Sequence, residues 1–254
     1  MTSELVHIVR RGPACTLTLD SPHNRNALSS QLLGELADGL ADAAADAAVR
    51  VIVLTATGRV FCSGADLSER AGVDISRVPE ILAALCAAPK PVIARVNGHA
   101  RAGGLGLIAA SDLAVATAGT TLAFSEVRVG VAPALILVPS LRLTDRRFLA
   151  RATLTGDTFS AGQAAGAGIL TDVVADEPAL DEWVEHTVAS ILKSAPGAVS
   201  ATKALLRELP ELSWSAGLEE ARIRSAELFA GAEAVEGIDA FFAKRAPTWD
   251  VSAS

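Results

Sequence analysis

The sequence lacks tyrosine, has a single methionine and contains only 4% aromatic residues, although 50% of its 254 residues are hydrophobic. A core made from such a chain packs through aliphatic side chains and close backbone contacts. No apolar run reaches the roughly 18–20 residues of a membrane-spanning helix, so we expect no membrane span. The chain is long enough to bury a large core in one domain, alone or with an appended region.

Positive charge is scarce as well, because 22 Lys and Arg residues stand against 29 Asp and Glu and give a net charge of −7. No basic stripe could neutralise phosphates, so we expect no nucleic-acid partner. Three widely spaced cysteines and four scattered histidines argue against a disulfide scaffold and a metal site. Residues 1–4 lack the features of a signal peptide, and we expect a cytoplasmic protein.

Strand and helix patterns alternate along most of the chain and predict an α/β fold. Apolar, β-branched runs predict strands at 5–10, 14–19, 51–55, 91–96, 112–117, 121–124 and 170–174. Helical spacing of apolar residues predicts helices at 30–45, 81–87, 103–110, from about 143 to 165, and at 178–192. After residue 196 only helices are expected, at 199–209, 214–229 and 234–243. We therefore divide the chain into a core, 1–195, and a helical C-terminal region, 196–254.

Three short segments contain the candidate chemistry. Residues 61–66, expected in a loop after a buried strand, include Gly64, which lets a ligand approach the backbone. Residues 97–106 also follow a strand and open a helix, whose free N–H groups favour negative charge. Residues 124–133 place Glu126 beside apolar side chains, where a carboxylate can act as an acid or base. Taken singly, each has an ordinary alternative: a strand-to-helix turn, a tightly packed small-residue helix, or an ion-paired glutamate.

The second segment also matches the glycine pattern of dinucleotide-binding folds, from Gly104 to Ala109, with Glu126 20 residues beyond Gly106. In those folds the glycines directly follow the strand, whereas seven residues separate Val96 from Gly104 here. A dinucleotide oxidoreductase is therefore the weaker alternative.

Together, these segments resemble the crotonase superfamily, the enoyl-CoA hydratase/isomerase family, over nearly the whole chain. The resemblance is carried by Asn26-Ala27-Leu28, by 51–55 running into 61–67, by 89–94 leading into 97–104, and by 124–133, 154–156, 160–161 and 240–247. It implies a crotonase-like spiral of repeated ββα units with a C-terminal α-helical region that builds trimers or hexamers. It also implies an acyl-CoA thioester substrate, with no cofactor besides the coenzyme A that the substrate contains.

The resemblance further implies roles for individual residues. The N–H groups of Ala65 and Gly103 would form an oxyanion hole for a thioester enolate, and Glu126 would be the acid/base. Residues implied at the substrate or coenzyme A are Arg25, Ala27, Leu28, Ser63, Gly64, Asp66, Leu67, Gly104, Phe241 and Lys244. Simpler alternatives are a solvated loop charge for Arg25 and helix packing for Phe241.

One acid of the family pattern is missing. Family hydratases carry two glutamates on opposite sides of a water; Glu126 aligns with the second, but Gly106 aligns with the first. A Δ3,Δ2-enoyl-CoA isomerase needs one shuttling carboxylate, whereas a hydratase that lost a general base would slow by about 10²–10⁴-fold. We expect isomerisation or hydration of enoyl-CoA in fatty acid metabolism, with acyl-CoA binding without turnover as the alternative. Residues 134–140 also depart from the family's glycine-rich pattern, so the acyl chain length stays open.

No other side chain is an obvious replacement for the missing acid. Asp66 is expected to cap a short helix, Glu69 to face solvent, and His99 to pack beneath the turn before Gly103. Arg101 is expected on the surface, with a contact to a polar acyl group as the alternative.

Overall fold

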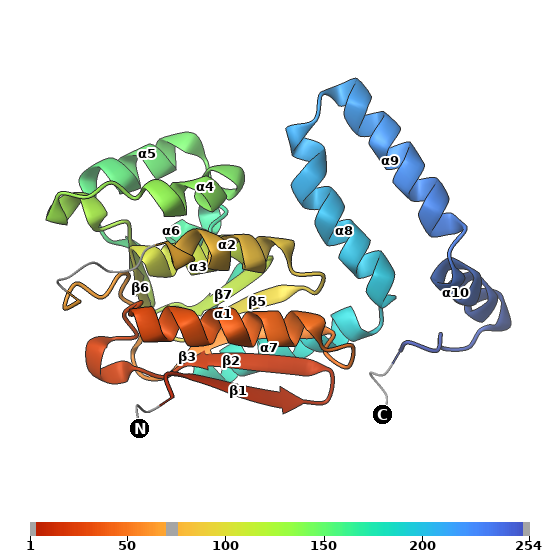
Figure 1. Ribbon diagram of the computed structural model, residues 1–254, viewed down its shortest axis with the longest axis horizontal. Coiled ribbons are helices and arrows are strands. Elements are labelled where there is room, and N and C mark those ends of the chain that lie inside the picture. The colour runs from red at the N-terminus through yellow and green to blue at the C-terminus, as the bar shows by residue number, and fades with distance from the viewer. Residues whose placement is uncertain (1–3, 70–75, 251–254) are drawn as a thin grey trace.

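The computed structural model describes residues 4–69 and 76–250 and contains two β-sheets flanked by helices (Figure 1). Residues 1–3, on which the signal-peptide expectation partly rests, lie outside these ranges. The larger sheet has the order β1-β2-β3-β5-β7-β10 and the smaller one β4-β6-β8-β9. The strands are β1 (Val6–Arg11), β2 (Ala14–Leu19), β3 (Val51–Ala56), β4 (Val60–Cys62), β5 (Val92–Val96), β6 (His99–Arg101), β7 (Leu113–Thr117), β8 (Thr121–Ala123), β9 (Phe159–Ser160) and β10 (Asp172–Val174).

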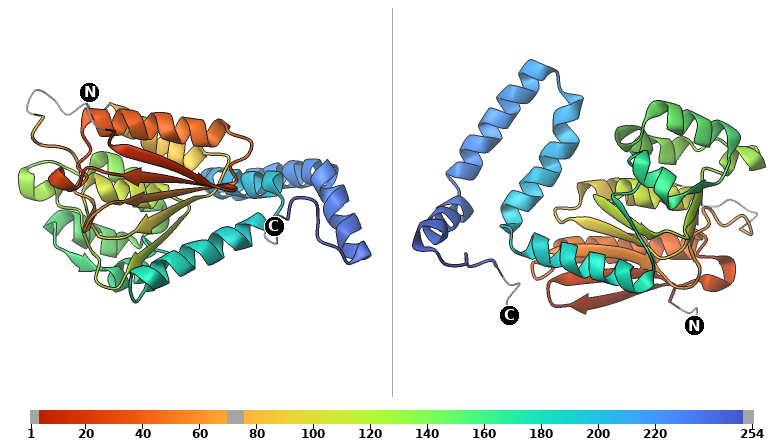
Figure 2. Two further views of the ribbon diagram at one scale, coloured as in Figure 1. Left: turned by 90° about the horizontal axis from the view of Figure 1, so that it is seen from below. Right: turned by 180° about the vertical axis from the view of Figure 1, so that it is seen from behind.

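Helices cover both faces of the larger sheet, and this explains why its central strand β3 is buried throughout. Ile52 and Leu54 pack into one apolar cluster with α1 (Ser30–Ala45), α2 (Arg77–Ala87) and α3 (Gly103–Ala110). The alternate residues Val51 and Val53 pack against α7 (Glu177–Leu192) on the opposite face. The left-hand view of Figure 2 shows α1 and α7 on either side of the strands.

The hairpin β1–β2 and the helix α1 follow their sequence signals. The two strands pair antiparallel around Gly12, whose φ of +55° lies in the left-handed region. The hydroxyl of Ser29 accepts a hydrogen bond from the amide of Leu32 and caps α1. Leucines at helical spacing turn towards the core, as predicted.

The smaller sheet was not predicted as such, because two of its strands lie in segments read as loops. Residues 56–66 were expected to be a loop, yet they contain β4, and β6 lies in the second glycine-rich segment. Both strands have three residues, too few to show a period of two. Their conformation is fixed by parallel pairing with neighbouring strands that are distant in sequence.

The remaining core helices differ from the prediction mainly at their starts. They are α4 (Ala134–Leu143), α5 (Arg146–Thr155) and α6 (Ala161–Gly166). Helical structure resumes at Ala134, nine residues before the predicted start at Leu143, and Pro139 inside α4 weakens its sequence signal. Likewise α2 begins at Arg77, four residues before the predicted start. Ser160 caps α6 through a reciprocal bond pattern with Gln163.

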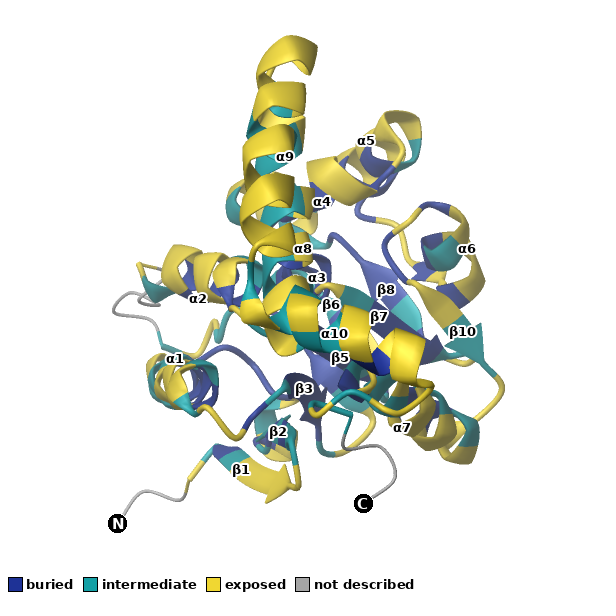
Figure 3. Ribbon diagram, turned by 90° about the vertical axis from the view of Figure 1, so that its right-hand side faces the viewer, coloured by how far each residue is buried: buried dark blue, intermediate teal, exposed yellow. Residues whose placement is uncertain are grey.

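The C-terminal region consists of α8 (Pro196–Glu208), the short 3-10 helix η3 (Leu209–Glu211), α9 (Trp214–Phe229) and α10 (Ala232–Ala243). It extends away from the sheets (Figures 1 and 2), and the surfaces of α9 and α10 are largely exposed (Figure 3). In the two described ranges no helix is long and apolar enough to cross a bilayer. The predicted α/β fold with terminal helices is confirmed.

Candidate active site

Three of the predicted segments meet because they follow three neighbouring parallel strands. Cys62 of β4 is paired with Ala100 of β6, which is paired with Leu122 of β8. The carboxyl ends of parallel strands lie at the same edge of a sheet. The loop of residues 63–66, the start of α3 and the segment leading to Glu126 therefore emerge side by side.

The backbones of the first two segments are in direct contact at Gly64 and Gly103. A Cβ atom on Gly64 would lie 2.6 Å from Cβ of Ala102 and 3.2 Å from the nitrogen of Gly103. A Cβ atom on Gly103 would lie 3.5 Å from Cα of Gly64 and 2.8 Å from a methyl group of Leu28. Glycine at both positions is what permits this approach.

The amides of Ala65 and Gly103 are both left free by this arrangement. The loop pairs with residues 25–28 through the bonds Ser63 N–H to Arg25 O, Leu28 N–H to Gly64 O, and Asp66 N–H to Leu28 O, at 3.1, 2.8 and 3.3 Å. In this ladder the Ala65 amide is not used, and Gly103 is the first residue of α3. Neither N–H donates a hydrogen bond to any residue that the structure describes.

Ala102, the residue before Gly103, has an unfavourable backbone conformation. Its φ and ψ are 48° and −122°, a combination that costs a non-glycine residue about 1–3 kcal/mol. Its own amide donates to the carbonyl of Ala123 at 3.0 Å, which ties the turn to β8. The turn fixes the direction in which the next amide points.

Glu126 begins the 3-10 helix η2 (Glu126–Val129), just beyond β8. Its Oε2 atom is buried and has no hydrogen-bond partner in the described part of the chain. Burial raises the pKa of this carboxyl above its ordinary value. The ordinary alternative, a pair with Arg128, does not form, because Arg128 contacts Asp157 at 2.6 Å. Glu126 is therefore poised to exchange protons.

The loop before α1 is positioned by Asn26, whose role the sequence analysis did not single out. Its fully buried amide accepts a hydrogen bond from the Ser21 N–H at 2.7 Å and donates to Thr57 O and Val60 O at 2.9 and 2.7 Å. Arg25 and Asn26 both have positive φ, which Asn tolerates better than most residues. Ala27 and Leu28 are buried beside the loop of residues 63–66, whereas the Arg25 side chain is exposed.

The acidic residues after this loop have structural partners. Asp66 accepts hydrogen bonds from the amide and hydroxyl of Ser68 and from Asn24, and these bonds keep its pKa low. Residues 67–68 form a turn, and the rest of the short helix predicted after Asp66 would lie beyond residue 69, outside the described residues. Glu69 accepts hydrogen bonds from the amide and hydroxyl of Ser30 at the start of α1, so it does not face solvent freely as predicted. Leu67 is 68% exposed between them.

The expectation that His99 packs beneath the turn was wrong, and Arg101 is only partly at the surface. His99 is exposed in β6 and bonds to the amide and hydroxyl of Thr121, since residues of a strand alternate between its faces. Arg101 is half-buried and donates to the carbonyls of Ala100 and Thr121. Burial lowers the pKa of this guanidinium.

The glycines of the dinucleotide-like pattern are buried within α3. A Cβ atom on Gly104 would lie 2.7 Å from the carbonyl oxygen of Cys62, and one on Gly106 would lie 2.5 Å from Ile136. These glycines allow the helix to pack closely on its neighbours. The close packing explains the pattern without a pyrophosphate.

The structure does not bring Phe241 and Lys244 to these segments within one chain. Arg50, which precedes β3, donates a hydrogen bond to the carbonyl of Trp249 at 3.0 Å, so the chain after α10 lies at the amino end of that strand. The other predicted residues lie at the carboxyl ends of the strands, near β6, on the far side of the molecule from α10 (Figure 1).

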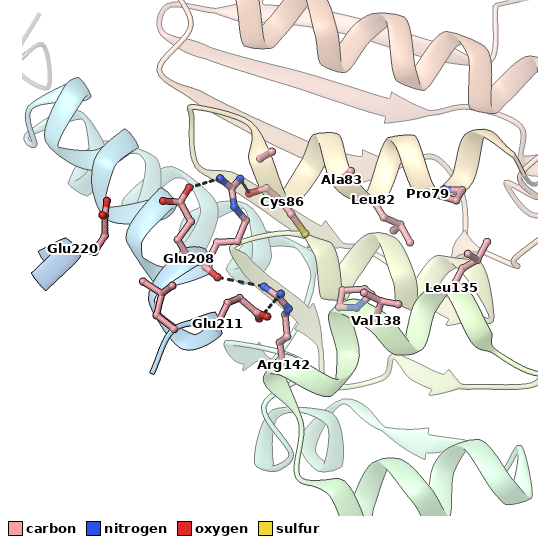
Figure 4. Close-up of a pocket in the computed structure, with 14 residues that line it drawn as sticks. Pro79, Leu82, Ala83, Cys86, Leu135, Val138, Arg142, Glu208, Glu211 and Glu220 are labelled. Carbon is pink, nitrogen blue, oxygen red and sulfur yellow. Dashed lines mark hydrogen bonds and ion pairs between the residues drawn. The ribbon is translucent and has the colours of Figure 1, made fainter. Parts of the chain in front are cut away.

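A cavity of about 830 Å³ lies between α2, α4 and the C-terminal helices (Figure 4). Its walls are mostly apolar at the end formed by α2 and α4, while ion pairs such as Arg142–Glu211, at 2.5 Å, lie at the other end. Neither Ala65, Gly103 nor Glu126 lines it. Sequence reasoning gave no sign of this cavity, because its walls come from helices far apart in the chain.

Comparisons with known proteins show which family and which relatives this chain resembles. The sequence model of the Enoyl-CoA hydratase/isomerase family matches residues 11–252. A 2,3-dehydroadipyl-CoA hydratase of Escherichia coli (strain K12) is 34% identical over 251 residues, covering 96% of this chain and 98% of that protein. The Enoyl-CoA hydratase domain-containing protein 3, mitochondrial, of Danio rerio is 32% identical over 256 residues, 98% of this chain and 88% of that protein.

Solved structures share the fold as well. A crystal structure of an enoyl-CoA hydratase of Mycobacterium smegmatis has a TM-score of 0.92 and 35% identity, and the match covers 97% of this chain and 99% of that chain. The fold implied by the sequence resemblance is thereby confirmed.

Proposed function

Because this chain belongs to the enoyl-CoA hydratase/isomerase family and is an acyl-CoA enzyme of that family, we propose that it catalyses Δ3,Δ2-enoyl-CoA isomerisation with Glu126 as its single acid/base. The observation that carries this proposal is that three neighbouring paired strands lead to two free amides, at Ala65 and Gly103, and to the half-buried carboxyl of Glu126, whose Oε2 atom has no partner among the described residues. The two amides can bind a developing oxyanion, and the carboxylate can accept a proton.

In the proposed reaction the thioester oxygen accepts hydrogen bonds from the amides of Ala65 and Gly103. Glu126 takes a proton from C2, and the electrons of the broken C–H bond pass into a conjugated enolate. The same proton then bonds to C4 as the double bond moves from C3–C4 to C2–C3. Each preoriented donor to the enolate oxygen contributes about 10²–10³-fold in rate. The raised pKa of Glu126 strengthens it as a base towards a weakly acidic C–H bond.

Hydration of a 2-enoyl-CoA is the second candidate, and the printed names of relatives favour it, since the Escherichia coli protein is a hydratase. Glu126 would then protonate C2 after water attacks C3. The absence of a side chain at Gly106 favours isomerisation, because no second base is available there to activate the water.

Coenzyme A is proposed to bind along the two loops that pair with each other. Its proposed contacts within one chain are Arg25, Ala27, Leu28, Ser63, Gly64, Asp66, Leu67 and Gly104. We propose that the chain forms trimers or hexamers and that Phe241 and Lys244 close the site of a neighbouring copy. Their position at the opposite end of the strands supports this, as do exposed apolar side chains on the terminal helices, including Trp214 at 84% and Phe241 at 77%.

Exchange of the C2 protons of acyl-CoA thioesters in D₂O, together with conversion of 3-enoyl-CoA, tests the proposal. The unmodified protein is expected to exchange these protons and to isomerise. Glu126→Gln is expected to reduce both rates by about 10²–10⁴-fold, because the general base is lost. Unchanged rates in this variant would reject the role of Glu126. Tight acyl-CoA binding with no exchange would identify a binding protein instead.

A further inference from the structure

The space beside Gly106 is already filled by hydrocarbon. A Cβ atom on this residue would lie 2.5 Å from Cγ2 and 3.2 Å from Cβ of Ile136, and 3.4 Å from a methyl group of Leu82. Cβ atoms in proteins essentially never approach another heavy atom within 3.0 Å. The absence of a side chain at Gly106 and the presence of a large one at Ile136 are therefore parts of one packing arrangement.

Ile136 cannot easily leave this space. It belongs to the first turn of α4, is 3% exposed, and joins the main apolar cluster of the core. Its carbonyl accepts a hydrogen bond from the hydroxyl of Ser140 at 2.7 Å, one turn further along the helix. The packing of α4 on α3 thus fills the position of the missing acid with a buried apolar side chain.

The surroundings of this side chain are apolar too. Leu82, which lies beside Gly106 with Ile136, also lines the 830 Å³ cavity, as do Leu135 and Val138 of α4 (Figure 4). The charged residues that line the cavity come from the end of α4 and from the C-terminal helices, where Arg142 is bound to Glu211. An ordered water needs two to four polar partners, and the residues that fill the space beside Gly106 offer none.

We infer that Ile136 determines the specificity of the reaction: it fills the place of the missing acid, excludes the water that a hydratase must hold, and restricts the site to proton transfer by Glu126. This inference rests on the proposed function of Glu126. Isomerisation balances without any other reactant, because the proton lost from C2 is the proton gained at C4. Hydration forms a C3–O bond and requires a second group to accept a proton from the attacking water.

The ratio of 2-enoyl-CoA hydration to C2-proton exchange tests the inference, because exchange reports on the oxyanion hole and Glu126 alone. In the unmodified protein, hydration is expected to be at least about 10²-fold slower than isomerisation of the matching 3-enoyl-CoA. The double variant G106E/I136G places a carboxylate in the vacated space and is expected to raise the ratio by on the order of 10²-fold. G106E alone is expected not to raise it, because its side chain collides with Ile136.

A second experiment, on the single variant I136G, tests the same inference if the double variant folds poorly. I136G opens the space without adding an acid. Formate supplied in solution is expected to raise the hydration-to-exchange ratio of this variant about tenfold or more. It is expected to leave the ratio of the unmodified protein unchanged. I191G, which removes an isoleucine from α7 on the other face of the sheet, is the matched control and is expected to show no response.

Two results would overturn the role of Ile136. One is an unmodified protein that hydrates 2-enoyl-CoA as fast as it isomerises 3-enoyl-CoA. The other is a hydration-to-exchange ratio that stays at the original value in formate-treated I136G, or in G106E/I136G, while exchange continues. Loss of exchange in the unmodified protein is a different outcome, since it rejects the proposed function itself.

Discussion

Glu126 is held where partial burial opposes its charge, and the hydrogen bond with its own backbone amide offsets this effect only in part. Its Oε2 atom is buried without a partner among the described residues, whereas Asp66, at the end of the loop of residues 63–66, accepts three hydrogen bonds and has a lowered pKa. The two carboxyl groups thus have opposite properties although both follow short strands. This contrast supports the assignment of proton transfer to Glu126 and of turn stabilisation to Asp66.

The raised pKa of Glu126 has a consequence for stability. Because the folded protein binds this proton more tightly than the unfolded chain, stability falls as the pH rises from the ordinary carboxyl value of 4.5 through the raised pKa. Glu126→Gln carries no charge and escapes this loss. We expect the variant to match the unmodified protein near about pH 4 and to exceed it in stability at about pH 8.

Urea unfolding across this pH range measures the difference in the free energy of unfolding between the two proteins. A pKa that is higher by one in the folded protein corresponds to about 1.4 kcal/mol. Glu182→Gln, an exposed position on α7, is the matched control. A stability difference between Glu126→Gln and the unmodified protein that is flat with pH, or that shrinks as the pH rises, would contradict a pKa of Glu126 raised by burial.

At the scale of elements, the sequence predicted the long strands and helices but not the short strands that position the site. A run of β-branched residues predicts β3, and spaced leucines after the capping residue Ser29 predict α1. β4 and β6 have no local signal, because only pairing with strands far along the chain defines them. The candidate residues could be named from their resemblance to a family, but their convergence depends on pairings that only the structure shows.

The packing of α4 on α3 could not be predicted from the sequence either, because it brings together residues that lie far apart in the chain. Residues 134–140 were recognised as unusual, yet nothing in the sequence links Ile136 to Gly106, thirty positions earlier. A glycine in a helix has many explanations, and only the position of Ile136 beside it in the structure selects one. Under the proposed function, this packing would determine which reaction the site supports.

The junction between α8 and the sheet contains a second buried charge. The ammonium of Lys203, 7% exposed, contacts Asp112 at 2.6 Å and donates to the carbonyls of Leu85 and Lys90 at 2.9 and 3.0 Å. Burial lowers the pKa of Lys203 and raises that of Asp112, while each partner opposes the effect on the other. Lys203→Met is expected to destabilise the protein by about 3 kcal/mol, because Asp112 loses its cation and the carbonyls of Leu85 and Lys90 lose their buried donor.

Urea unfolding of Lys203→Met checks this value. Arg222→Ala, which breaks an exposed pair with Glu219 on α9, is the control and is expected to have no measurable effect. Adding Asp112→Asn to Lys203→Met should recover part of the loss, since no unpaired charge then remains. Equal stability of Lys203→Met and the control would show that α8 does not depend on this pair.

At the scale of the whole molecule, the two halves of the proposed site lie at opposite ends of one chain. The loops, α3 and Glu126 lie at the carboxyl ends of the strands, and α10 lies beyond their amino ends (Figure 1). Apolar side chains such as Phe229 at 72% and Phe242 at 77% remain exposed on the terminal helices (Figure 3). Association of copies would cover these side chains and would carry Phe241 and Lys244 to another copy's site.

Mixed assemblies test this arrangement. Glu126→Gln removes the base but keeps α10, whereas the double variant F241A/K244A keeps the base but alters the proposed closing residues. Alone, the first is expected to be nearly inactive, and the second to raise KM for acyl-CoA about tenfold, equivalent to a loss of 1.4 kcal/mol in binding. When the two are co-expressed with different tags and isolated as mixed assemblies, sites that combine an intact Glu126 with a neighbour's intact Phe241 and Lys244 should have the KM of the unmodified protein.

The same mixture separates closure by a neighbour from closure within one chain. If α10 served its own site, every active site in the mixture would belong to the F241A/K244A chain and would keep the raised KM. A control assembly of Glu126→Gln with the triple variant E126Q/F241A/K244A should show no recovered activity, because no copy in it has the base. Recovery of the low KM therefore requires two different copies to contribute to one site, which no rearrangement of a single chain can imitate.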